Sequence, residues 1–227
     1  MSAARLIETI ALADLALVWL GVFSLAYRVR RFHPALKPFY WYLCLVGVIE
    51  VLSKMYVYYW KGNNLYLFYL FAVGELILLS VVYLRIFEDK RKQPKLRLLL
   101  LFLLVLVTGY NFWKLGTSPK DFDLYGKLPV HAVIIVLALI FFMRSLKEPG
   151  RYIKHFNALA FINSAILFYF SGTFIIYIIF NKMVNENVSE SVYLWVINVL
   201  LSFIFHLLSI IALWQKDNRQ AKFSHFG

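Results

Sequence analysis

Long apolar runs separated by short polar segments make up most of the chain. The runs lie at about 6–27, 38–60, 64–86, 96–114, 128–146, 156–180 and 191–214. About 20 apolar residues in a helix, each rising roughly 1.5 Å, match the hydrocarbon core of a bilayer. Backbone in lipid must satisfy its own hydrogen bonds, and the runs are too long for barrel strands, so each run predicts a transmembrane helix. The pattern predicts an all-α integral membrane protein with a seven-helix bundle.

No segment between the runs is long enough for a soluble domain, so we expect residues 1–227 to form a single transmembrane domain. The composition agrees, since 62% of the residues are hydrophobic and 16% are charged. Soluble domains are roughly half apolar and about one quarter charged. The net charge of +12 lies in the short segments between the runs, which indicates membrane topology and no nucleic-acid partner. The single cysteine, Cys44, lies in an apolar run and offers no disulfide framework or cysteine metal site.

The distribution of lysine and arginine predicts the orientation. Seventeen of these residues fall in one set of connecting segments and the C-terminal tail, against six on the opposite side. The positive-inside rule places the richer set in the cytoplasm, so we expect the N-terminus outside and the C-terminus inside. Aromatic residues at 39–42 and 56–60 are typical of interfacial belts at the two boundaries.

Two pairs of similar segments suggest a weak internal repeat. Residues 28–36 resemble residues 151–159, and the start of the third run, 65–68, resembles the start of the seventh, 192–195. A three-plus-one-plus-three arrangement would follow, with the fourth run as the linker.

Polar side chains inside the apolar runs are the candidates for function. A charge in hydrocarbon costs several kcal/mol unless it faces the bundle interior or a wet cavity. At about 1.5 Å per residue, most of these groups lie in the outer half of the predicted membrane. We expect them to line an outward-opening pocket for a zwitterionic or cationic small molecule. The candidate ligand-binding residues are Asp14, Glu50, Lys54, Glu75, His131 and Asn198.

Simpler interpretations stay open for several of these residues. Glu50 and Lys54 are four positions apart in VIEVLSKMYVYYW, so they could neutralise each other as an ion pair on one helical face. Glu75 could be protonated and hydrogen-bonded across helices. Asn163 and His206 are secondary candidates on the cytoplasmic side of the middle, and packing or core hydrogen bonding is the more typical role for both.

Several known classes do not fit. The seventh run contains no lysine, which excludes a retinal Schiff base of the usual kind, and no run has a proline in its middle. Ceramidase-like hydrolases require an HxxxH pair that this chain lacks. No nucleophile–base spacing or complete set of metal ligands occurs, so we expect no catalytic residues, no metal and no cofactor.

The chain does resemble a group of small bacterial seven-helix inner-membrane proteins of unassigned activity. The resemblance rests on Glu50 with Ser53-Lys54, Gly74-Glu75-Leu76, Asn163-Ser164-Ala165, Phe170-Ser171-Gly172 and Leu213-Trp214. The resemblance implies a seven-helix topology and a location in a bacterial inner membrane. It says little about which reaction or ligand the chain would serve.

Three classes of function remain. The first is a non-enzymatic ligand-binding or sensory membrane protein, whose basic cytoplasmic side would meet a signalling protein. The second is a small-molecule or proton-coupled transporter, in which Glu50 and Glu75 would carry the exchangeable charge. The third, and least favoured, is an intramembrane hydrolase that uses the carboxylates and His206.

Overall fold

The computed structural model describes residues 3–60, 64–87, 93–116, 126–147, 156–186 and 191–215. This part contains α1 (Ala3–Ala26), η1 (Val29–Arg31), α2 (Leu36–Trp60), α3 (Leu65–Ile86), α4 (Gln93–Gly116), α5 (Leu128–Lys147), α7 (Phe156–Asn185) and α8 (Ser191–Trp214). No strand occurs among these residues. All seven α-helices are long and apolar enough to cross a membrane, so the prediction of an all-helical chain with seven helices of this kind is confirmed for the described residues.

The helices begin and end close to the predicted positions. The largest difference is in α7, which continues past the predicted end at 180 to Asn185. Pro38, Pro94 and Pro129 lie in the first turns of α2, α4 and α5. Proline is tolerated there because the first backbone N–H groups of a helix have no intrahelical acceptor.

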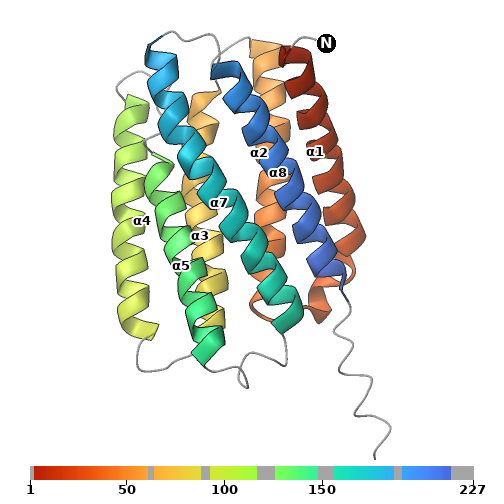
Figure 1. Ribbon diagram of the computed structural model, residues 1–227, viewed down its shortest axis with the longest axis vertical. Coiled ribbons are helices and arrows are strands. Elements are labelled where there is room, and N and C mark those ends of the chain that lie inside the picture. Colours follow the sequence, from red (N-terminus) through yellow and green to blue (C-terminus); the bar gives the residue numbers. More distant parts are fainter. Residues whose placement is uncertain are drawn as a thin grey trace, which may run out of the picture.

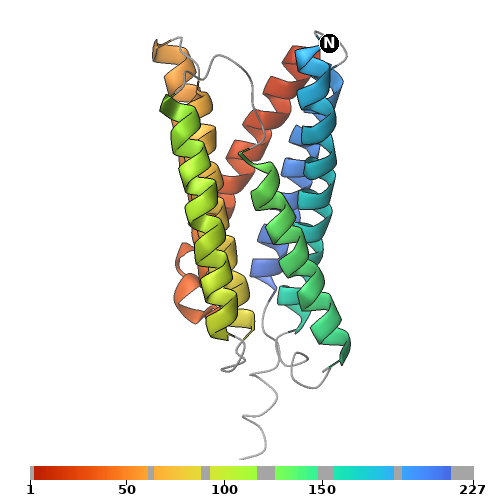
Figure 2. The same ribbon diagram turned by 90° about the vertical axis from the view of Figure 1, so that its left-hand side faces the viewer.

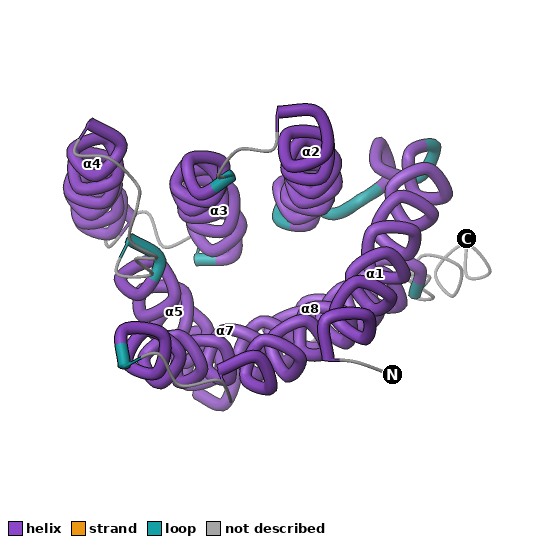
Figure 3. The backbone as a smooth tube through the Cα atoms, turned by 90° about the horizontal axis from the view of Figure 1, so that it is seen from above, coloured by secondary structure: helices purple, strands orange, loops and turns teal. Residues whose placement is uncertain are grey.

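The helices form two rows. Figure 3 shows α2, α3 and α4 in one row and α1, α8, α7 and α5 in a curved second row. Contacts between neighbours close a ring in the order α1, α2, α3, α5, α7 and α8, because α1 packs against both α2 and α8. Helix α4 stands at the edge of the bundle, packed against α3 (Figure 1).

The helices of the second row lean in opposite directions. We call the end of the bundle where α1 begins the N-terminal end. Figure 2 shows that α1 starts there on the side of α7 and α8 and crosses obliquely to reach α2 at the opposite end, whereas α5 lies nearer to α3 and α4 at the N-terminal end and leans away from them toward the other end.

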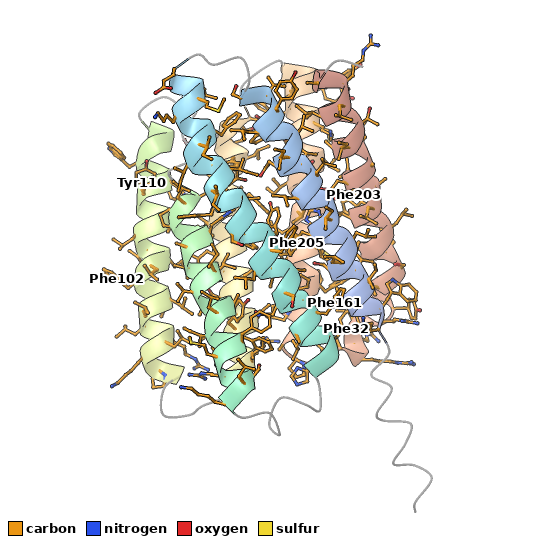
Figure 4. The ribbon with its side chains drawn as sticks, viewed as in Figure 1. Phe32, Phe102, Tyr110, Phe161, Phe203 and Phe205 are labelled. Atoms are coloured by element: carbon orange, nitrogen blue, oxygen red, sulfur yellow. The ribbon has the colours of Figure 1, made fainter. Side chains whose placement is uncertain are left out.

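Large apolar side chains cover the outward faces. On α4, for example, Phe102 points away from the bundle, whereas Phe205 of α8 lies inside it (Figure 4). Soluble proteins rarely expose apolar surface on this scale. Polar residues lie on the inward faces and are buried, among them Asp14, Glu75, Asn111, His131, Asn163, Asn198 and His206. Apolar outward faces with polar inward faces indicate a membrane protein.

An aromatic cluster fills the middle of the bundle. Tyr169 of α7 stacks on Phe205 with ring centroids 4.6 Å apart, and Phe39 of α2 meets Phe205 edge to face at 6.2 Å. We had expected residues 39–42 to form an interfacial belt, and this was wrong for most of them. Phe39, Tyr40 and Tyr42 are buried because α2 turns this face toward α8, and only Trp41 is exposed.

The orientation of the bundle and the internal repeat stay predictions. Several basic residues that carry the orientation, among them Lys61, Lys90, Arg91, Lys92, Lys120 and Arg151, lie outside the described residues.

Close contact between α1 and α8 yields a stability prediction. A Cβ atom at Gly21 would lie 2.6 Å from Ile210 Cγ1, whereas one at Gly109 on α4 would meet nothing within 4 Å. We expect Gly21→Leu to lower the free energy of unfolding by about 1–3 kcal/mol through overpacking. Gly109→Leu is the matched control and should leave stability unchanged or raise it, because leucine forms helix better than glycine. Equilibrium unfolding in mixed micelles measures both, and equal stability of the two variants would contradict this packing.

Candidate functional site

A cavity of ≈ 250 Å³ lies between the two rows, beside the C-terminal half of α2, the start of α3 and the first half of α8. Its walls come from α1, α2, α3, α7 and α8, with Asn64 and Lys127 added from the helix starts. The lining residues with polar or aromatic side chains are Asp14, Tyr42, Glu50, Ser53, Asn64, Phe68, Phe71, Lys127, Tyr169, Tyr177, Trp195, Asn198, Ser202 and His206. Polar groups from helices far apart in the sequence therefore converge on one interior space.

Asp14 joins α1 to α8 at the cavity wall. Its carboxylate oxygens lie 2.8 and 3.0 Å from His206 Nδ1, and Ser202 Oγ donates a hydrogen bond to Oδ2 at 3.1 Å. Depths estimated from the sequence had placed His206 and Asp14 on opposite sides of the middle. These depths stay predictions, and the contact shows only that the two side chains meet across α1 and α8.

Glu75 is the most deeply buried carboxylate of the site, with no exposed side-chain area. Tyr42 of α2 donates a hydrogen bond to Oε1 at 3.2 Å. On the other oxygen, Lys127 Nζ lies 3.7 Å from Oε2 and His131 Nε2 lies 3.8 Å from it. Glu75 thus meets one cation and two further polar side chains, although it lies behind the residues that line the cavity.

Aromatic rings enclose the ammonium of Lys127. Its Nζ lies 4.6 Å from the ring centroid of Phe68, 4.4 Å from that of Phe71 and 6.0 Å from that of Tyr177. Cations within about 6 Å of a ring centroid are attracted by the negative face of the ring. The ammonium therefore has Glu75 on one side and aromatic rings on the other, which explains how a lysine can be 97% buried, at 3% exposure.

His131 extends the polar contacts of Glu75 to α7. Its Nδ1 lies 3.0 Å from Thr173 Oγ1, and the threonine hydroxyl also lies 2.8 Å from the Tyr169 carbonyl oxygen. The hydroxyl has a single proton, so when it donates to the carbonyl it accepts from His131. Through Tyr42, Lys127, His131 and Thr173, Glu75 connects α2, α3, α5 and α7.

Glu50 and Lys54 do not form the ion pair that their spacing allows. Both residues are described, yet their charged atoms are not within 4.0 Å of each other in the described part of the chain. Glu50 is half-buried and faces the cavity, whereas Lys54 lines an outer hollow of ≈ 620 Å³ between α1 and α2. Glu50, Ser53 and Asn64 line both spaces, and the Asn64 side chain donates a hydrogen bond to Ser53 Oγ at this border.

The two buried asparagines have different surroundings. Asn163 is fully engaged, since its Oδ1 accepts a hydrogen bond from Tyr83 at 2.7 Å and its Nδ2 donates to the Ala138 carbonyl at 3.2 Å. Asn198 lines the cavity, and its Oδ1 is buried without a hydrogen-bond partner among the described residues. A buried acceptor without a partner costs about 1–3 kcal/mol. Asn163 thus links helices, while Asn198 lies at the cavity wall with its Oδ1 buried.

The structure brings some of the predicted site residues together and separates others. Asp14, Glu50, Asn198 and the secondary candidate His206 line the cavity. Glu75 and His131 lie behind its wall, Lys54 lies in the outer hollow, and Asn163 belongs to a separate cross-link.

Sequence reasoning missed Lys127, Tyr42 and Ser202. Lys127 had been counted as an ordinary loop lysine on the outer side. The available signal was its spacing of four from His131, which places both side chains on one face at the start of α5. Among the described residues, no group of three or more histidines, cysteines or acids could hold a metal ion.

Comparisons with known proteins add nothing to this description of the site. No family model, curated protein or solved structure matches the chain. The chemistry of the site therefore rests on its own geometry.

The contact between Glu75 and Lys127 yields a second prediction. Lys127→Met removes the cation but leaves the carboxylate buried, which we expect to cost about 3–5 kcal/mol. The double variant Glu75→Gln/Lys127→Met removes both charges and should recover at least half of that loss. A double-mutant cycle of unfolding free energies in mixed micelles measures the coupling.

Lys182→Met is the control, because it removes an exposed lysine whose pair with Glu186 spans 4.0 Å, and we expect no change in stability. If the losses of unfolding free energy in the Glu75→Gln and Lys127→Met single variants add up to the loss in the double variant, the two charges do not stabilise each other, and the prediction is wrong.

Proposed function

We propose that the chain is an integral protein of the bacterial inner membrane that binds a small polar ligand, as a non-enzymatic ligand-binding or sensory protein. The observation that carries this proposal is the cavity between the two helix rows, on which Asp14, Glu50, Asn198 and His206 converge. Its ligand is a zwitterionic or cationic small molecule, and a cytoplasmic signalling protein would meet the basic side of the bundle.

The cavity has the properties of a binding site and not of a packing defect. At roughly 30 Å³ for each water in the liquid, ≈ 250 Å³ corresponds to about eight water molecules. Packing defects in proteins are small and apolar, whereas ligand sites combine apolar walls with a few convergent polar groups. Here aromatic rings supply the walls, and charged side chains from α1 and α2 supply the polar groups.

Two features of the bundle favour sensing over transport: the helices around the cavity are continuous, and the bundle beyond the cavity is closed by packed side chains. Transporter sites are often formed by interrupted helices, but α1, α2, α7 and α8 continue without a break past the cavity. Beyond the cavity, the rings of Phe39, Tyr169 and Phe205 pack against one another, and Tyr83 bonds Asn163 across α3 and α7. Transport would require all of these contacts to open.

The arrangement of Asp14, Ser202 and His206 also argues against hydrolysis. A serine nucleophile requires a base that contacts its hydroxyl. Here Ser202 and His206 both bond to Asp14, so the carboxylate lies between the hydroxyl and the imidazole.

The proposed orientation is testable with engineered cysteines. In a Cys44→Ala background, we expect Ser2→Cys to react with a membrane-impermeant maleimide in intact cells, because the N-terminus is proposed to lie outside. Lys222→Cys should react only after the membrane is permeabilised. The reverse pattern would place the cavity opening on the cytoplasmic side and remove the outer-half pocket from the proposal.

Native mass spectrometry of the gently extracted protein tests the cavity itself. We expect the wild type to retain a small molecule that Val199→Trp loses, because Val199 lines the cavity and a tryptophan there would fill it. Leu200→Trp is the matched control, since it adds the same side chain one residue along at a position 41% exposed on the outer face. Equal retention by both variants, or none by a stable wild type, would contradict a ligand in this cavity.

A further inference from the structure

We infer that the cavity takes a small organic monocation, an amine held as its ammonium ion between Asp14 and Glu50, and that it discriminates against the corresponding amino acid. The inference rests on the proposed function and names the class of ligand for the same site.

The charges that line the cavity leave a negative excess. Asp14 and Glu50 contribute two carboxylates, and Lys127 contributes the one lysine among the described lining residues. The ammonium of Lys127 is already engaged by Glu75 and by the surrounding rings. Lys127 therefore neutralises a third carboxylate, Glu75. Of the two carboxylates that line the cavity, Asp14 contacts His206. Glu50 lies one helical turn from Lys54, which lines the outer hollow and not the cavity.

Carboxylates from two helices face the same space. Asp14 of α1 and Glu50 of α2 both line the cavity. An ammonium group provides up to three hydrogen-bond donors, so it can contact carboxylates on both helices at once.

The cavity walls suit an organic ammonium better than a bare metal ion. Tyr169, Tyr177 and Trp195 contribute ring surface, together with Phe68 and Phe71. The chain shows that rings of this cavity hold an ammonium, because Lys127 Nζ lies 4.4 Å from the Phe71 centroid. Recognition of ammonium ligands by aromatic side chains is a general use of the cation–π interaction.

A ligand carboxylate would find no equivalent partner. Lys127 could bind one only by leaving Glu75 buried without a cation, which costs several kcal/mol. Lys54 lies in the outer hollow and does not line the cavity. An amino acid would therefore bring its carboxylate against Asp14 and Glu50, whereas the amine alone complements them.

The outer hollow offers the ligand a route of access between α1 and α2. It shares Glu50, Ser53 and Asn64 with the cavity, so the hydrogen bond from Asn64 to Ser53 lies where the two spaces meet. Glu50 faces both spaces and is the first interior carboxylate that an incoming cation would meet.

Isothermal titration of the purified full chain in detergent tests this class of ligand with matched pairs of probes. Phenethylamine is compared with phenylalanine, and 3-methylbutylamine with leucine, because each pair differs only by a carboxylate. We expect at least one amine to bind ten-fold or more tightly than its amino acid, and 3-phenylpropanoate not to bind.

Two variants localise the effect. Glu50→Gln should weaken binding of the amine at least ten-fold. Glu8→Gln makes the same chemical change in the outer hollow, at a residue that does not line the cavity, and should change affinity less than three-fold. Size-exclusion profiles and unfolding midpoints establish that both variants are folded.

Amino acids that bind as tightly as their amines, or amine binding that is unchanged in Glu50→Gln, would overturn the inference. Glu50-dependent binding of sodium or potassium with no amine binding would assign the site to an inorganic cation and also overturn it. If no amine binds while native mass spectrometry still finds a molecule that Val199→Trp loses, the proposed function stands and the monocation class fails. If neither experiment finds a ligand, both fail.

Discussion

A carboxylate buried in the middle of an apolar bundle is the constraint on which the rest of the structure depends. Glu75 has no exposed side-chain area, and an isolated charge in this position would be costly. Its neutralisation requires Tyr42 from α2, Lys127 from the start of α5 and His131 from α5, and His131 in turn contacts Thr173 of α7. One acidic side chain on α3 thereby determines how three other helices are rotated about their axes. Packing between apolar surfaces alone specifies helix rotation less sharply in lipid, where there is no hydrophobic force between helices.

The same constraint determines the charge of the cavity. Because the ammonium of Lys127 is paired with Glu75, the charge of the cavity lining is determined by the carboxylates of Asp14 and Glu50. Had Lys127 been free, its ammonium would have offset one of the two carboxylates. The interior thus has two layers, a paired carboxylate and lysine behind the wall and two carboxylates at its surface, and the proposed preference for amines depends on the first layer.

The sequence predicted the helices well and their relative rotation poorly, for a physical reason. Hydrophobic length alone determines where a helix can cross a membrane, so all seven spans were found within a few residues. Which side chains meet depends on tilt and rotation, which local sequence does not encode. The spacing of Glu50 and Lys54 suggested an ion pair, but α2 directs one into the cavity and the other into the outer hollow. Asp14 and His206 lie in the first and last helices, and no local pattern indicated that they approach within 2.8 Å of each other.

Two lysines show why position outweighs residue type in this bundle. Lys54 lies within an apolar run and drew attention as a membrane-embedded charge, yet it faces the outer hollow, where water or lipid headgroups can solvate it. Lys127 lies just before the first residue of α5 and looked like a loop charge, yet it is 3% exposed and contacts a buried carboxylate. The tilts of the helices explain both, since the oblique course of α1 leaves a hollow between α1 and α2, whereas the start of α5 leans inward beside Glu75. In the proposed site, the charge at the end of a helix therefore matters more to the interior than the charge in the middle of one.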